Sequence, residues 1–176
     1  MGNETFMLTG SLGCIGAWVI RNLVAEGVKV VATDLATDPA RPRLLLSDEA
    51  LESVSFARLD VTDLAAVKKV VADHGVTHII HLAGLQVPFC RGNPSLGAHV
   101  NVTGTVNIFE AARAYWGQVQ GLSYASSLAV LGPTEYYPET PVKDDVALHP
   151  MTLYGVYKQP TRARRVFIGR TGRFPA

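Results

Sequence analysis

The sequence of 176 residues has only two cysteines, Cys14 and Cys90, and they lack the spacing of metal ligands. A disulfide scaffold and a cysteine metal site are therefore excluded, and reduced thiols in a cytoplasmic protein are expected. No apolar run approaches the roughly 18 residues that a membrane span needs. The N-terminus also lacks the charged start and long apolar stretch of a signal peptide. We therefore expect no membrane partner.

Charge is also scarce. Charged residues make up 18% of the chain and hydrophobic residues 48%, which is typical of a globular protein of one domain. The net charge is +1, but residues 159–176 contain no acid and five arginines: Arg162, Arg164, Arg165, Arg170 and Arg173. Without these five charges, residues 1–158 have a net charge of −4. The body therefore offers no positive field for nucleic acid, and a nucleic-acid partner is disfavoured.

Short apolar runs alternate with helical patterns along the chain. Runs rich in β-branched residues and bounded by Gly or Asp predict strands at 5–10, 28–34, 54–60, 77–84 and 121–127. Apolar residues at helical spacing predict helices at 14–26, 63–74 and 98–116, with Thr62 as a cap of the second. Residues 35–53, with Pro39 and Pro42, predict a loop before a short helix. This alternation predicts an α/β fold of the Rossmann type, a doubly wound parallel sheet with helices on both faces.

The turn "LTGSLGCIGAW" places Gly10, Gly13 and Gly16 between the first strand and the first helix. Glycines there permit a tight turn and close approach of the backbone to a pyrophosphate, which the helix N-terminus attracts. Asp34 ends the second strand, where a carboxylate can accept hydrogen bonds from a ribose 2′-hydroxyl. That carboxylate would repel a 2′-phosphate, and no arginine occurs between residues 22 and 40. The sequence therefore favours NAD over NADP, and Asp34→Ala is expected to narrow the difference in affinity.

Several short motifs follow in a consistent order: "LDV" (59–61), "HLAG" (81–84), "NVTGT" (101–105), "ASSLAVLG" (125–132) and "YGVYK" (154–158). With the glycines spaced three apart, they resemble the extended short-chain dehydrogenases/reductases, the NAD-dependent epimerase/dehydratase family. The resemblance covers residues 5–158. It implies NAD as the cofactor, with contacts from Gly10, Leu12, Gly13, Cys14, Ile15, Gly16, Asp34, Asp60, Val61, Leu82, Ala83, Gly84, Asn101, Tyr154 and Lys158.

The same resemblance implies a catalytic set of Ser127, Tyr154 and Lys158. An ordinary tyrosine is a poor base at neutral pH, and a lysine one helical turn away brings a positive charge that favours the phenolate. Tyr154 would exchange a proton with a substrate hydroxyl or carbonyl, and Ser127 would hydrogen-bond that oxygen. Gln86 and Ser126 are expected on the substrate side, with Ser126 chiefly structural. His81 is expected to satisfy a hydrogen bond at a strand end, and the ring of Tyr157 to pack or line the cleft.

The type of reaction stays open. Related dehydratases have an acidic residue after the catalytic Ser or Thr, whereas Leu128 and Ala129 follow Ser127, so dehydration is disfavoured. Epimerisation and dehydrogenation of a sugar, a sugar nucleotide or a related alcohol both fit, and a homodimer is one expected assembly. Leu131 stands where V-Y-G has tyrosine, which weakens a match to galactose epimerases. A catalytically silent NAD sensor and a nucleic-acid binder that uses the arginine tail are the alternatives.

The end of the chain departs from the family. Residues 1–158 are expected to form the NAD-binding core with its catalytic set, and residues 159–176 an atypical basic tail. Pro160 is expected to end or kink the catalytic helix near Tyr157 at a cost of about 3 kcal/mol. One nucleotide restored after the Gln159 codon allows a frame that puts Glu four residues beyond Lys158, as in the family, so a shifted frame is expected. A deliberately shortened chain with a vector-derived end and a native basic tail are the rival explanations, and gene sequencing decides among them. Without the family's last strands and substrate region, this chain is expected to turn over little and to leave its substrate unidentified.

Overall fold

The computed structural model describes residues 4–159. Within them the chain divides into two compact units. Unit 1 consists of residues 4–84 and 104–125, and unit 2 of residues 85–103 and 126–159. Length alone predicts one domain. The division arises because the chain leaves unit 1 after residue 84, returns at residue 104 and leaves again after residue 125.

Unit 1 is built on a parallel sheet of five strands. The strands are β1 (Thr5–Thr9), β2 (Lys29–Asp34), β3 (Val54–Arg58), β4 (His78–His81) and β5 (Gly121–Tyr124), in the order β3-β2-β1-β4-β5. All five predicted strands and the doubly wound order are confirmed, although β5 ends three residues before Ser127. The order reverses between β1 and β4, and in such sheets ligands bind outside the carboxyl ends of the strands at this point.

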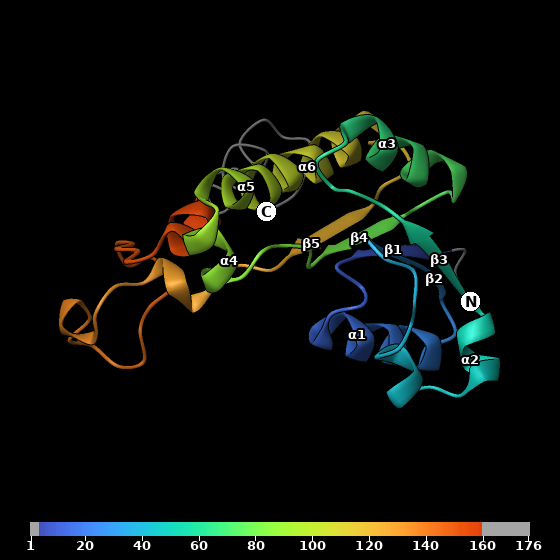
Figure 1. Cartoon of the computed structure of the whole chain (residues 1–176), viewed down its shortest axis with the longest axis horizontal. Helices are drawn as coiled ribbons and strands as arrows, with labels where there is room; N and C mark the ends of the chain where they lie inside the picture. Colours follow the sequence, from blue (N-terminus) through green and yellow to red (C-terminus); the bar gives the residue numbers. More distant parts are fainter. Residues whose placement is uncertain (1–3, 160–176) are drawn as a thin grey trace. The chain divides into compact units, whose positions relative to one another are not determined.

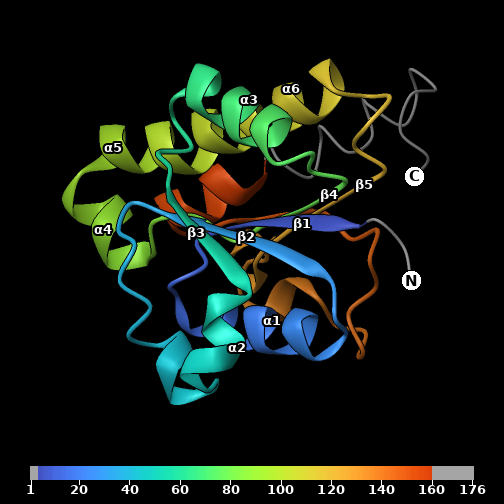
Figure 2. The ribbon, with the colours of Figure 1, turned by 90° about the vertical axis from the view of Figure 1, so that its right-hand side faces the viewer.

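Helices cover both faces of the sheet in unit 1. Figure 1 and Figure 2 show α1 (Cys14–Ala25) and α2 (Asp48–Glu52) on one face, and α3 (Leu64–Asp73) and α6 (Thr105–Ala114) on the other. The predicted cap Thr62 is wrong by one residue. Asp63 is the N-cap of α3, and its Oδ1 accepts from the backbone N–H of Ala66 at 3.0 Å. A carboxylate suits this position because it also interacts favourably with the helix dipole.

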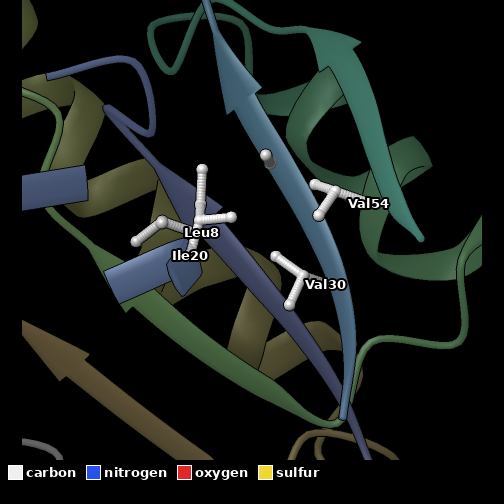
Figure 3. Close-up of a cluster of buried hydrophobic side chains, with 5 residues drawn as sticks. Leu8, Ile20, Val30 and Val54 are labelled. Carbon is white, nitrogen blue, oxygen red and sulfur yellow. The ribbon is translucent and has the colours of Figure 1, made fainter. Parts of the chain in front are cut away.

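The core under α1 consists of apolar side chains from three strands and the helix. Figure 3 shows Leu8 of β1, Ile20 of α1, Val30 of β2 and Val54 of β3 gathered between these elements. Leu8 and Ile20 have no exposed surface. Burial of one such side chain contributes about 1.5–3 kcal/mol. This packing holds α1 against β1 and β2, and so fixes the turn that joins β1 to α1.

Unit 2 is made of short helices and irregular segments. It contains α4 (Val87–Gly92), α5 (Pro94–Ala98), the start of a π-helical turn (His99–Gly104), and 3₁₀ turns at Leu128–Val130 and Thr134–Tyr136. A third 3₁₀ turn, Pro42–Leu44, belongs to unit 1. The predicted helix 98–116 is therefore interrupted, since only Thr105–Ala114 forms a regular α-helix. Neither α4 nor α5 was predicted, because five- and six-residue helices are too short to show a hydrophobic period.

Residues 153–159 are helical. Tyr157 packs as predicted. Its hydroxyl donates to the carbonyl of Pro94 at 3.0 Å, and its ring lies 3.0 Å from the Cβ position of Gly97. The helix includes Gln159, the last residue that the structure describes. The expectations for Pro160 and the basic tail concern residues that lie outside the described part of the chain.

Candidate functional site

The turn between β1 and α1 requires glycine at two positions. Gly10 has φ +68°, and a Cβ there would lie 2.7 Å from the backbone N of Ala83. A Cβ on Gly16 would lie 2.5 Å from the carbonyl oxygens of both Gly10 and Ser11. Real contacts of this kind do not occur below about 3.0 Å. Gly10 therefore permits the chain after β4 to pass close to the turn, and Gly16 permits the helix to pack onto it.

The N-terminus of α1 is open. Its N-cap is Gly13, which has no side chain to accept from the first-turn N–H groups. Cys14 and Ile15, both predicted cofactor contacts, are exposed in this first turn. A helix N-terminus of this kind favours an anion through its N–H groups and its dipole.

Asp34 is directly joined to the glycine turn. Its Oδ2 accepts from the backbone N–H of Leu12 at 3.0 Å, and its Oδ1 accepts from the N–H of Leu35 at 2.8 Å. Each carboxylate oxygen can accept a second hydrogen bond, so both keep capacity for a ligand hydroxyl. The prediction placed Asp34 at the end of β2, and the structure places it there.

A buried network ties the ends of β1 and β4 to α6. The two ring nitrogens of His81 lie 2.6 Å from Thr9 Oγ1 and 3.0 Å from Thr105 Oγ1. Thr9 Oγ1 also accepts from the backbone N–H of Ala83 at 3.3 Å. The structure therefore confirms the structural role predicted for His81. The network fixes the segment of Leu82, Ala83 and Gly84, which the resemblance assigns to the cofactor.

A second close approach explains the glycine of "NVTGT". A Cβ on Gly104 would lie 2.6 Å from Val61 Cγ2. Asn107 Nδ2 donates to the carbonyls of Val61 and Thr62 at 3.0 and 2.9 Å, which fixes the chain after β3. The carboxylate of Asp60 accepts from the N–H and the hydroxyl of Thr62. Asp60 and Val61 are thus held rigidly where the chain leaves the sheet.

In unit 2, the turn that begins at Ser127 and the helix that bears Tyr154 approach each other at one glycine, Gly155. Ser127 is the N-cap of the turn Leu128–Val130, and its Oγ accepts from the N–H of Ala129 at 3.1 Å. A Cβ on Gly155 would lie only 2.0 Å from the carbonyl oxygen of Ala129. The helical residue next to Tyr154 therefore packs directly on the turn that begins at Ser127, which side-chain-bearing residues would prevent.

Lys158 is 4% exposed and its Nζ lies 5.9 Å from the centre of the Tyr154 ring. Burial lowers the pKa of Lys158 below its usual value, and the nearby Cys90 partly counteracts this. Proximity of this kind allows the ammonium charge to favour a phenolate on the tyrosine.

Asn101 has a clear structural role. Its Oδ1 accepts from the N–H of Leu85 at 2.7 Å, and its Nδ2 donates to the carbonyl of Leu85 at 2.8 Å and to Cys90 Sγ at 3.3 Å. The amide thus brackets one residue of the segment that follows "HLAG". A cofactor contact from Asn101 stays a prediction, whereas these bonds hold the segment before α4 in place.

A cavity of about 390 Å³ lies in unit 2. It is lined by Ser126, Ser127, Leu128, Val130, Leu131, Val142, Lys143 and Asp144. Both serines predicted from the sequence contribute to it. Gln86 occupies a different part of this unit, as the N-cap of α4. The charged pair Lys143 and Asp144 was not predicted, because nothing local in the sequence relates it to Ser127.

Two further residues outside the predicted set bear on the glycine turn. Ser11 Oγ is buried and has no hydrogen-bond partner among residues 4–159. A ligand oxygen or a water is the partner that such an atom requires. Arg41 Nη1 donates to the carbonyl of Leu12 at 3.0 Å, across 29 positions of sequence.

Between residues 4 and 159, no group of three or more His, Cys, Asp or Glu side chains is arranged to hold a metal ion. The helices of the same stretch include none with the length and apolar character of a membrane span.

The model of the NAD dependent epimerase/dehydratase family matches residues 6–162. The inactive L-threonine 3-dehydrogenase of Homo sapiens mitochondria is 29% identical over 154 residues, which are 86% of this chain and 61% of that protein. An uncharacterized epimerase/dehydratase of Staphylococcus aureus is 33% identical over 159 residues, 88% of this chain and 45% of that protein. The chain thus spans roughly half the length of these relatives.

Solved structures of similar proteins have the same fold. The L-threonine dehydrogenase of Clostridium difficile has a TM-score of 0.81 at 26% identity, covering 97% of this chain and 50% of that one. The UDP-glucose 4-epimerase of Thermus thermophilus, in complex with NAD, has a TM-score of 0.76 at 26% identity and covers 96% and 51%.

Proposed function

Because the chain belongs to the NAD dependent epimerase/dehydratase family, we propose that it binds NAD(H) and takes part in oxidation or reduction at a secondary alcohol carbon. Unit 1 carries the adenosine and pyrophosphate contacts of this proposal, and unit 2 carries the catalytic side chains. When bound, the nicotinamide supplies the acceptor or donor of hydride.

The residues of unit 1 fit this cofactor. The turn is tight because Gly10 and Gly16 have no Cβ. The open N-terminus of α1 would present its N–H groups to a pyrophosphate. Ser11 Oγ is a buried polar atom that still needs a partner. Asp34 retains acceptor capacity for the ribose hydroxyls. The cradle therefore has donors for the phosphates and an acceptor for the sugar.

In unit 2, Tyr154 would hold or remove the proton of the substrate hydroxyl. The charge of Lys158 would favour the phenolate form that accepts this proton. Ser127 Oγ would hydrogen-bond the same substrate oxygen and fix its position. These three residues need no metal ligand and no acidic partner to exchange a proton at a hydroxyl.

One observation carries the proposal: the backbone contact of Gly155 with Ala129 joins the Ser127 turn to the helix that bears Tyr154 and Lys158. A surface tyrosine and lysine at helical spacing would need no such approach. Lys158 is also buried, although burial of an ammonium costs free energy. A costly buried charge next to a tyrosine is typical of a site where the charge is used.

For the substrate we propose a small amino alcohol of the L-threonine type. The human and Clostridium difficile relatives bear this name. The cavity beside Ser127 also offers one charge of each sign, Lys143 and Asp144, as an amino acid does at neutral pH. Lys143 is exposed and pairs with Glu139 at 2.6 Å, so a carboxylate substrate would compete with that surface pair.

Two further candidates rest on the comparisons. The Thermus thermophilus protein is a UDP-glucose 4-epimerase, which supports a sugar nucleotide as the substrate. The human relative is named as inactive, which supports a protein that binds NAD without turnover. The three candidates predict different results: reduction of NAD with L-threonine, reduction of NAD with a sugar nucleotide, or binding of NAD without any reduction.

The test combines binding with turnover. Binding of NADH is measured by the change in its fluorescence, and reduction of NAD by absorbance with L-threonine, UDP-glucose and a simple secondary alcohol. We expect NADH binding and slow L-threonine-dependent reduction, because the chain spans roughly half the length of its relatives, with a further loss of about 100-fold or more in Tyr154→Phe. Failure to bind NADH would refute the proposal. Binding with no reduction by any of the three substrates would instead support the silent protein.

A further inference from the structure

The segment after β2 returns to the glycine turn. Arg41 precedes the 3₁₀ turn Pro42–Leu44, in which Pro42 is buried. Arg43 next to it pairs with Asp38 at 3.1 Å, and its N–H donates to the carbonyl of Pro39 at 2.9 Å. These contacts order the segment and bring the Arg41 guanidinium to the Leu12 carbonyl at 3.0 Å.

Leu12 is therefore held at both ends by charged side chains. Its N–H donates to the Asp34 carboxylate, and its carbonyl accepts from Arg41. Among residues 4–159, Asp34 and Arg41 form no ion pair with each other within 4.0 Å. A guanidinium has five N–H donors, and one of those of Arg41 donates to the Leu12 carbonyl. Arg41 is an exposed residue.

The charges of Asp34 and Arg41 suit the two forms of the cofactor, NAD with a 2′-hydroxyl and NADP with a 2′-phosphate. Asp34 stands where a ribose 2′-hydroxyl donates a hydrogen bond, and it repels a phosphate at that oxygen. A 2′-phosphate carries roughly two negative charges. A guanidinium can bind its oxygens in a bidentate geometry. Arg41 is one position beyond the arginine-free stretch on which the sequence-based preference for NAD rests.

We propose that Arg41 is a second specificity-determining residue of the adenosine site, which binds the 2′-phosphate and so gives the chain measurable affinity for NADP(H). This inference rests on the proposed binding of NAD(H). Asp34 keeps NADP(H) the weaker ligand. When Asp34 is removed, the gain in NADP(H) affinity depends on Arg41.

A purely structural role makes a different prediction. If Arg41 only braces the glycine turn through Leu12, its loss weakens NAD and NADP equally, because both share the pyrophosphate that the turn binds. The ratio of the two dissociation constants therefore separates the roles. Arg43→Gln is the matched control: it removes the same charge two positions away, from a side chain that pairs with Asp38.

The experiment is calorimetric titration of NAD and NADP into the wild type, Arg41→Gln, Arg43→Gln, Asp34→Ala and the double variant of Asp34 and Arg41. We expect Arg41→Gln to raise the NADP-to-NAD ratio of dissociation constants about tenfold, as for loss of one charged hydrogen bond. Arg43→Gln should leave the ratio within about twofold. Asp34→Ala should lower the ratio, and the added Arg41→Gln should reverse most of that change.

An unchanged ratio in Arg41→Gln, with NAD still bound by the wild type, would overturn this inference alone. Equal loss of affinity for both cofactors would do the same and assign Arg41 to the turn. A wild type that binds neither cofactor would overturn the proposed function and this inference together.

Discussion

Replacement of Gly10 by alanine would put a methyl group against the chain that follows β4. The new Cβ would lie 2.7, 2.8 and 2.9 Å from three backbone atoms of Ala83 and Leu82. These are backbone atoms, so they move only if the segment after β4 moves. The His81 network holds that segment through Thr9. The substitution therefore forces apart two segments that form one face of the glycine turn.

Two terms set the magnitude. Gly10 has φ +68°, and a residue with a Cβ in the left-handed region costs about 1–2 kcal/mol. Overpacking against fixed neighbours costs a further 1–3 kcal/mol or so. The expected loss in unfolding free energy is therefore about 2–5 kcal/mol, against a total of about 5–15 kcal/mol for an ordinary domain.

Gly27 supplies a matched control. Its φ is +71°, and a Cβ there would meet nothing within 4 Å. Gly27→Ala therefore incurs the backbone term and gains the same unfolded-state entropy effect, without the packing term. The difference between the two variants, about 1–3 kcal/mol, measures the contact of Gly10 with the chain after β4.

The assay is urea denaturation of the wild type and both variants, followed by circular dichroism, with the unfolding free energy extrapolated to water. NADH binding is measured on the same samples, and Gly10→Ala should weaken it more than Gly27→Ala. If the two variants lose the same unfolding free energy within about 0.5 kcal/mol, the argument is refuted, because the segment after β4 would then move without cost.

Two further predictions concern unit 2. Gly155→Ala should lower the unfolding free energy by about 1–3 kcal/mol, because its Cβ would lie 2.0 Å from the Ala129 carbonyl oxygen. Gly92→Ala is the control and should cost little, because a Cβ there would meet nothing within 4 Å. Equal melting temperatures of the two variants would contradict this. Lys158→Met should abolish turnover. Since burial lowers the pKa of Lys158, the unfolded wild type binds more protons than the folded one between that lowered pKa and about 10.4. The unfolding free energy of the wild type relative to Lys158→Met should therefore rise with pH across this window, and a fall would show that the folded protein favours the charged lysine.

Much of unit 1 could be predicted because its signals are local. Buried parallel strands appear as short apolar runs, and Asp34 directly ends one of them. The glycines at positions 10 and 16 were recognised from spacing, and the structure supplies the contacts that require them. The role of His81 at a strand end followed from its place at the end of an apolar run.

Other features depend on residues far apart in the sequence. Val61 requires a glycine at position 104, and the Ala129 carbonyl requires one at position 155. The Asn101 amide is hydrogen-bonded to Leu85, although its motif resembles a cofactor contact. Each of these contacts depends on two segments that come together only in the folded chain, so no local pattern indicates them.

The sequence by itself determined the order of strands and helices along the chain and the glycine turn with Asp34, and it predicts the set of Ser127, Tyr154 and Lys158. Only the tertiary structure decided that Arg41 reaches Leu12, that Ser11 Oγ is buried without a partner in the described chain, and that Lys158 is buried. The physical reason is that the hydrophobic period of a segment, its turn residues and its charge depend on residues that are neighbours in the sequence. Burial and hydrogen bonding across 29 positions arise only when packing brings distant backbone segments into contact.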